Sequence, residues 1–170
     1  GVLLMALVTD EAGHSAPRLG EVELAPDDAR RFHVELVRDV VRMLCIGLIH
    51  GDLSEYNVLV APEGPVIIDL PQVVSAAGNN AARAMLLRDV HNLRDSLARF
   101  APELAATHYG EEMWLLYEKG ELQPDTVLTG QFTFDQHDAD VGAVMMSIED
   151  ARQEALIREQ GRAEAAAAED

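Results

Sequence analysis

Two segments of the chain, residues 26–46 and 81–100, have apolar residues at helical spacing, and this periodicity constrains the fold more than any other feature. Pro26 stands where the first turn of a helix accepts proline, and Asp27 and Asp28 follow at the end where the helix dipole favours negative charge. Both segments are therefore predicted to be long amphipathic helices. Their predicted core-facing residues are Phe32, Leu36, Val37, Val40, Leu44 and Cys45 in the first helix and Met85, Leu86, Val90, Leu93, Leu97 and Phe100 in the second.

A third helix is predicted from Pro102 to Lys119, because proline suits a first helical turn and Gly120 follows the end. Another helix is expected over residues 140–160, and the last ten residues lack an apolar face and are expected to be frayed. The third helix is expected to bury Leu104, Met113, Trp114, Leu115 and Tyr117, and the fourth to pack through Val144, Met145 and Ile148.

A short β-rich stretch lies between the first two helices. Residues Asn57–Val60 and Pro65–Asp69 flank the turn signal Ala61–Gly64, a pattern that predicts a hairpin. The predicted fold class is therefore α+β, mostly helical with one small β-hairpin.

Charge and composition exclude several classes of protein. The 170 residues include 30 acidic and 13 basic side chains, a net charge of -17, which disfavours direct binding to nucleic acid or to an anionic membrane. No apolar run reaches the roughly 18 uncharged residues of a membrane span, and the start lacks the basic residues of a signal peptide. A cytoplasmic protein is therefore expected.

The single cysteine, Cys45, is expected to be a small buried apolar residue.

Four polar residues in and beside the hairpin form the most informative motif. His50, Asp52 and Asn57 fit the pattern H-x-D-x-x-x-x-N of the protein-kinase catalytic loop, and Asp69 follows the next strand, where kinases have a magnesium ligand. A carboxylate such as that of Asp52 can orient an acceptor hydroxyl and take its proton, while Asn57 and Asp69 offer the oxygen ligands that Mg²⁺ prefers. Each residue alone would be an ordinary turn or cap residue. His50 is expected to brace the loop by hydrogen bonding to the backbone.

The segment HGDLSEYNVLV followed by VIIDLPQ resembles the RIO kinases, a family of atypical serine protein kinases. The part of this motif that distinguishes RIO kinases from other kinases is Ser54, Glu55 and Tyr56, which precede Asn57. The resemblance implies phosphoryl transfer from ATP to protein Ser/Thr with Mg²⁺ or Mn²⁺, with Asp52 as the catalytic base. The sequence MLLRDVHNL, with Arg88, Asp89 and Asn92, is also similar to the family pattern, and Asp89 is expected to brace the catalytic loop.

The resemblance also implies a domain organisation. Residues 1–8 would be a hinge-like segment and residues 9–128 a kinase C-lobe. Residues 129–170 are expected from their composition, and not from the resemblance, to be an acidic extension that is partly disordered. The amino-terminal lobe, with its phosphate loop and lysine, is expected to lie outside this chain, so that the chain alone would be inactive. The residues implied to contact the adenine of ATP are Met5, Leu7, Val8 and Ile68.

Two alternatives remain open from the sequence. The motif H-G-D at residues 50–52 is shared with aminoglycoside phosphotransferases, and Gly51 stands where RIO proteins often have alanine. A small-molecule phosphotransferase is therefore one alternative. A catalytically idle lobe that serves assembly is the other, although Asp52, Asn57 and Asp69 are all present.

Overall fold

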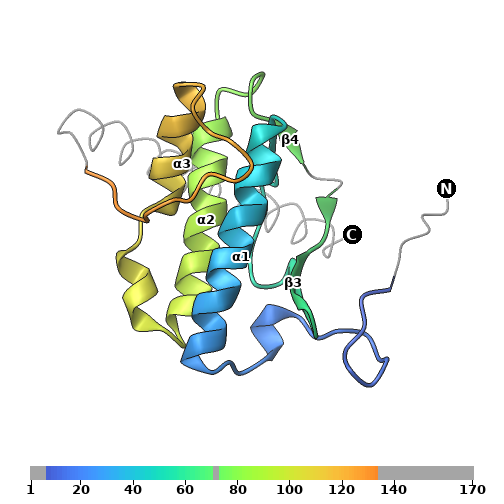
Figure 1. Ribbon diagram of the computed structural model, residues 1–170. Coiled ribbons are helices and arrows are strands. Elements are labelled where there is room, and N and C mark those ends of the chain that lie inside the picture. Colours follow the sequence, from blue (N-terminus) through green and yellow to red (C-terminus); the bar gives the residue numbers. More distant parts are fainter. Residues whose placement is uncertain (1–6, 71–72, 134–170) are drawn as a thin grey trace, which may run out of the picture. The chain divides into compact units, whose positions relative to one another are not determined.

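A computed structural model describes residues 7–70 and 73–133, and three α-helices are the longest elements of this part of the chain (Figure 1). All of its helices and strands belong to one compact unit that ends at Phe132. Among the described residues, no helix is both long and apolar enough to cross a membrane. In chain order the elements are η1 (Leu19–Glu21), α1 (Pro26–Cys45), β1 (Leu48–Ile49), β2 (Val58–Ala61), β3 (Gly64–Ile67), β4 (Val74–Ser75), α2 (Ala82–Ala98), η3 (Pro102–Ala106) and α3 (Tyr109–Glu118).

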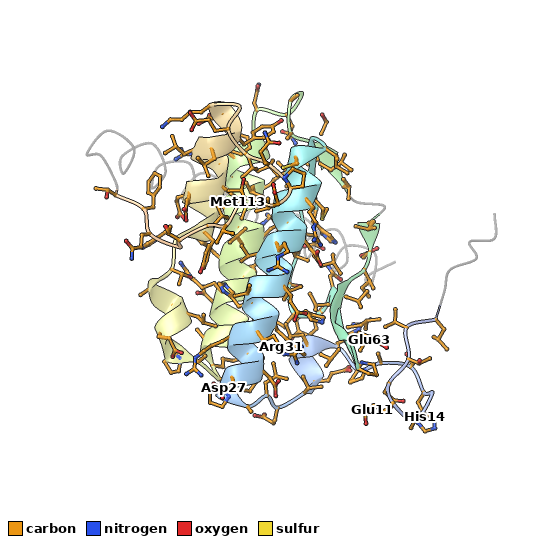
Figure 2. All side chains as sticks on the ribbon, in the orientation of Figure 1. Glu11, His14, Asp27, Arg31, Glu63 and Met113 are labelled. Carbon is orange, nitrogen blue, oxygen red and sulfur yellow. The ribbon has the colours of Figure 1, made fainter. Side chains whose placement is uncertain are left out.

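The core lies between α1 and α2, which run side by side in opposite directions (Figure 1). Both helices were expected within two residues of the bounds observed. Cys45 is only half-buried at the edge of this core, which corrects its predicted full burial. On the exposed face of α1, Arg30 pairs with Asp27 and Glu103, and Arg31 pairs with Asp28 and Glu35. Figure 2 shows Asp27 and Arg31 on this helix. The fully buried side chains of the two helices include Leu36, Leu44, Val41, Leu86, Leu93 and Leu97.

The predicted hairpin is formed by β2 and β3, which pair in antiparallel register from Val58 opposite Ile67 to Ala61 opposite Gly64. The mostly helical α+β class with a small hairpin is thus confirmed. A second antiparallel pair, β1 with β4, joins Leu48 to Ser75 and Ile49 to Val74. This pair is not predictable from the sequence, because two-residue strands are too short to show an alternating pattern.

The prediction of one helix from Pro102 to Lys119 is wrong, since the chain forms η3 and α3 with a break at Thr107 and His108. The Thr107 hydroxyl and backbone N–H both donate to the Leu104 carbonyl, and these hydrogen bonds end η3. The His108 N–H donates to the carbonyl of Gly130, 2.8 Å away, and is therefore not used within a helix. Leu115 is 38% exposed, which also corrects its predicted burial.

Leu115 is exposed because the helical repeat of α3 turns a different face to the core. Gly110, Met113 and Trp114 lie on that face at intervals of three and four residues, and Tyr117 is partly buried on the same side. Leu104 is buried as predicted. The fully buried Met113 lies in the helical part of the molecule (Figure 2).

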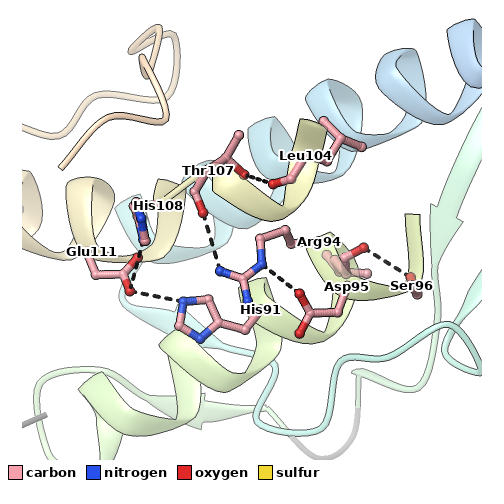
Figure 3. A network of polar contacts seen from close by, with 9 residues as sticks. His91, Arg94, Asp95, Ser96, Leu104, Thr107, His108 and Glu111 are labelled. Carbon is pink, nitrogen blue, oxygen red and sulfur yellow. Dashed lines mark hydrogen bonds and ion pairs between the residues drawn. The ribbon is translucent and has the colours of Figure 1, made fainter. Parts of the chain in front are cut away.

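A polar network connects α2 to the break before α3 (Figure 3). His91 Nε2 donates to Glu111 Oε1 over 3.0 Å, and Arg94 donates to the Thr107 carbonyl and to Asp95. Burial raises the pKa of Glu111, but the hydrogen bonds from His91 and from its own backbone N–H outweigh this effect, so that its pKa is lowered. Arg94 thus provides the Thr107 carbonyl, at the interruption, with a hydrogen-bond donor.

A latch holds residues 129–130 against α3. The Glu112 carboxylate accepts hydrogen bonds from the backbone N–H groups of Thr129 and Gly130 and from the Thr129 hydroxyl, at 2.7–3.0 Å. The hinge residues 1–6, the predicted helix over 140–160 and nearly all of the acidic extension lie outside the described residues.

The latch predicts an asymmetry between two glycines. Gly130 has a φ of 71° and lies so close to Tyr109 that an added Cβ would be 2.7 Å from the ring, whereas Gly120 has a φ of 70° with no atom within 4 Å. Gly120→Ala should cost about 1 kcal/mol of unfolding free energy from backbone strain alone. Gly130→Ala should cost about 2–4 kcal/mol because the ring must also move. Equal losses in urea unfolding would contradict this packing.

Buried His33 predicts a pH dependence of stability. Its ring lies edge-on to Tyr109, with centroids 5.3 Å apart, and burial together with the charge of Arg94 lowers its pKa from 6.5 to about 4. The unfolded chain therefore binds a proton below pH 6.5 that the folded chain does not, and stability falls as the pH drops toward 4. Between pH 7.5 and 5 the loss from His33 should be about 2 kcal/mol.

The measurement is urea unfolding at both pH values for three proteins. His33→Phe keeps an aromatic contact with Tyr109 and should lose this part of the pH dependence. His14→Gln alters an exposed histidine and should behave as the wild type. An unchanged pH dependence in His33→Phe would contradict the assignment.

Candidate functional site

The catalytic-loop motif joins β1 to β2, and its backbone is held by one buried carboxylate of α2. Asp89 is 1% exposed. Its Oδ2 accepts the N–H of Gly51 over 2.7 Å, and its Oδ1 accepts the N–H of Leu53 over 3.0 Å. The residue between these two anchored positions is Asp52, whose side chain is exposed.

Two further residues of α2 hold the carbonyl groups of the same segment. Arg88 donates through a guanidinium nitrogen to the Gly51 carbonyl, and Asn92 donates through Nδ2 to the Leu53 carbonyl over 3.1 Å. The N–H and C=O groups of both neighbours of Asp52 thus bind side chains from one helix. Burial raises the pKa of Asp89, while the two backbone N–H groups act in the opposite direction.

Gly51 adopts a φ of 83°, a conformation that glycine enters without strain and alanine does not. The glycine of the H-G-D motif therefore suits the positive φ that the loop requires at position 51. This relation between a residue type and a dihedral angle could not be recognised before the loop geometry was known.

His50 links the loop to the strand that ends before Asp69. The His50 side chain is 2% exposed, and its Nε2 lies 2.8 Å from the Ile68 carbonyl, which accepts the hydrogen bond. The Ile68 N–H donates to the Asn57 carbonyl over 2.9 Å, which continues the hairpin by one residue pair. Both backbone polar groups of Ile68 are thus engaged, and Asn57 and Asp69 lie at the same end of the hairpin.

Asp69 has a φ of 67° and is the only non-glycine residue with positive φ in the described part of the chain. Such a conformation costs free energy and persists only where surrounding contacts enforce it. Strained residues of this kind cluster at functional sites. The residue is exposed, as is Asp52.

Asn57 is connected directly to the catalytic-loop backbone. Its Nδ2 donates to the Asp52 carbonyl over 2.6 Å. This hydrogen bond fixes which end of the amide is a donor and leaves Oδ1, a suitable ligand oxygen for a hard cation. Among the described residues, no group of three or more His, Cys, Asp or Glu side chains could hold a metal ion by itself.

The segment Ser54–Glu55–Tyr56 forms the turn between the two anchored ends of the loop. The Ser54 carbonyl accepts the Asn57 N–H over 3.0 Å, and the Glu55 carbonyl accepts the N–H of Gly20 over 3.2 Å. Tyr56 is 57% exposed. The hydrogen bond from Gly20 attaches the loop to η1.

The residues assigned to adenine are only partly described. Met5 lies outside the described residues, Leu7 is 70% exposed and Val8 is half-buried. Ile68 is half-buried beside the site. Their assignment to adenine stays a prediction.

Comparison with known proteins identifies the family. A family model of the RIO domain matches residues 1–109, more than half of the chain. The chain belongs to the RIO domain family. The matched part of this RIO domain includes every residue of the candidate site described above.

Two relatives show how much of a RIO protein the chain represents. It is 40% identical over 100 residues to the RIO-type serine/threonine-protein kinase Rio1 of Haloferax volcanii and 33% identical over 107 residues to the serine/threonine-protein kinase RIO1 of Chaetomium thermophilum. Each alignment covers 58% of this chain, but 32% and 20% of the two relatives. The chain thus spans between a fifth and a third of their length.

A solved structure is similar as well, the Rio2 kinase–ADP/Mg²⁺–phosphoaspartate complex from Chaetomium thermophilum. The TM-score is 0.47 at 25% identity, with 80% of this chain and 44% of that chain covered.

The contacts of Asp89 predict its contribution to stability. Asp89→Ala leaves the N–H groups of Gly51 and Leu53 without their acceptor and should cost about 2–4 kcal/mol of unfolding free energy. Asp89→Asn keeps one acceptor oxygen and should cost about half as much. Hydrogen exchange at both amides should accelerate in Asp89→Ala.

The matched control is Asp39→Ala, which removes a carboxylate from an exposed pair with Arg42 and should change stability by less than about 1 kcal/mol. Protection of the Gly51 and Leu53 amides that survives in Asp89→Ala would contradict the proposed anchoring.

Proposed function

We propose that this chain supplies the catalytic and metal-binding residues of a RIO-type protein kinase, which transfers the γ-phosphoryl group of ATP to serine or threonine of a protein. The observation that carries the proposal is the anchored loop, in which α2 holds the backbone on both sides of Asp52. Family membership and the names of the relatives, serine/threonine-protein kinases, support it.

In this proposal Asp52 is the catalytic base. Its exposed carboxylate can accept a hydrogen bond from the acceptor hydroxyl, orient the oxygen toward the phosphorus and receive the proton as the new P–O bond forms. Because the Gly51 and Leu53 backbone is held by α2, Asp52 needs little reorganisation to act. The protein acceptor is identified only by its hydroxyl chemistry.

Asn57 and Asp69 fit the role of magnesium ligands. Both offer oxygen atoms, they lie at one end of the hairpin, and the Asn57 amide nitrogen is already engaged with the Asp52 carbonyl. Bound Mg²⁺ would neutralise phosphate charge during transfer. Ile68 and Val8 are proposed to contact adenine, together with Met5 and Leu7.

The remaining site residues are proposed to support these groups. His50 holds the strand end before Asp69, Asp89 holds the loop, and Ser54, Glu55 and Tyr56 shape the turn between Asp52 and Asn57. None of them needs to contact the reacting atoms. The activity itself is a property of the whole protein, since this chain spans a minor part of its relatives' length.

The proposal predicts different defects for three substitutions in the whole protein. Asp52→Asn should lower the rate of transfer by about 10³-fold or more while Mg-ATP affinity stays within about twofold, because the base acts in the transition state. Asp69→Asn should lower both the rate of transfer and the Mg-ATP affinity, since this carboxylate is the principal negative charge that the protein offers to the metal. The loss of Mg-ATP affinity in Asn57→Ala should lie between those of the other two variants, and high magnesium should restore part of it.

The measurements are phosphate transfer to a serine-rich protein and nucleotide binding by fluorescence. Glu63→Gln, in the turn at the opposite end of the same hairpin (Figure 2), is the matched control and should retain both properties. Equal losses of Mg-ATP affinity in Asp52→Asn and Asp69→Asn would mean that the base and the metal ligand are wrongly assigned. Transfer to aminoglycosides with no transfer to protein would favour the small-molecule enzyme.

A further inference from the structure

A groove of about 440 Å³ lies between α1 and the segment that follows α3. Val34, Val37 and Val41 of α1 line one side, and Val127 and Leu128 line the other. Val34 is 50% exposed and Val127 is 89% exposed. None of the residues lining the groove belongs to the candidate kinase site.

The charge at this groove differs from the charge of the chain. Its lining includes Arg38, Arg42 and only one carboxylate, Asp125, although the chain has a net charge of -17. Arg42 is paired with Asp39 at 3.0 Å. Arg38 has no carboxylate within 4 Å among the described residues, whereas Arg30 and Arg31 of the same helix each have two.

The second wall of the groove is a fixed part of the fold. The latch formed by Glu112 with Thr129 and Gly130 holds the chain immediately after Leu128. This wall lies beyond residue 109, where the match to the RIO domain model ends. The groove thus combines a wall inside the matched residues, on α1, with a wall outside them.

We propose that this groove binds a segment of a protein partner in which a carboxylate stands beside branched apolar side chains. Arg38 offers a guanidinium to the carboxylate, and a charge-assisted hydrogen bond of this kind is among the stronger polar contacts at a protein surface. The valines of both walls receive the apolar side chains, which thereby leave water. Nucleic acid is disfavoured, because valine side chains line both walls, Asp125 is among the lining residues and the chain has a net charge of -17.

The test uses the full 170-residue chain and a fluorescein-labelled peptide, KGLDLGK, followed by fluorescence anisotropy. The lysines offset the repulsion between an acidic protein and an acidic ligand. The peptide should bind with a dissociation constant of about 1 mM or tighter. The control peptide KGLNLGK is more positive, and it should bind at least about fivefold more weakly if a carboxylate is recognised.

Variants of the chain locate the binding. Arg38→Glu should weaken the binding of KGLDLGK about tenfold through like-charge repulsion, and Val34→Ser should weaken its binding about threefold. Arg83→Glu makes the same charge change at a residue that does not line the groove, and should stay within about twofold of the wild type. Circular dichroism checks that all variants are folded.

Several results would overturn the proposal. They are the absence of saturable binding, equal binding of KGLNLGK, or equal losses in Arg38→Glu and Arg83→Glu, which would indicate a response to net charge alone. Displacement of the peptide by a uridine oligonucleotide, lost in Arg38→Glu, would identify a phosphate site instead.

Discussion

The candidate site depends on the interaction between the Asp89 carboxylate and the backbone N–H groups of Gly51 and Leu53. A buried carboxylate and buried N–H groups are each costly without partners, and together they satisfy one another. Because Arg88 and Asn92 come from the same helix, the loop has a fixed relation to α2. The packing of α2 on α1 in the core therefore determines where Asp52 lies.

The second half of the site has a separate origin. The β2–β3 register places Asn57 and Ile68 opposite each other, and His50 then engages the Ile68 carbonyl. With both backbone groups of Ile68 engaged, the chain enters Asp69 in the left-handed region, at a φ of 67°. His50 thus couples the loop held by α2 to the hairpin, and the hydrogen bond from Asn57 to the Asp52 carbonyl couples them again.

The parts predicted from sequence are those with a repeating pattern or a complete motif. Helical periodicity identified α1 and α2, and the turn between two apolar runs identified the hairpin. The β1–β4 pair and the break at Thr107 arise from tertiary contacts, such as the Gly130 carbonyl that binds the His108 N–H, and no local pattern encodes them. The exposed position of Leu115 follows from the helical repeat of α3, which turns Gly110, Met113 and Trp114 to the core. Arg38 at the groove could be distinguished from its paired neighbours only after the contacts of α1 were known.

Asp89 and Glu111, the two buried carboxylates among the described residues, are stabilised in different ways, and acid affects them differently. Burial dominates at Asp89 and raises its pKa, so the folded state favours protonation there and this contribution to stability is lost as the pH rises. The hydrogen bond from His91 helps to lower the pKa of Glu111, so the stability gained there is present at neutral pH and is lost as the pH falls below 4.5. Acid therefore weakens the junction of α2 with α3 (Figure 3) at Glu111, while the folded state accepts the proton at Asp89.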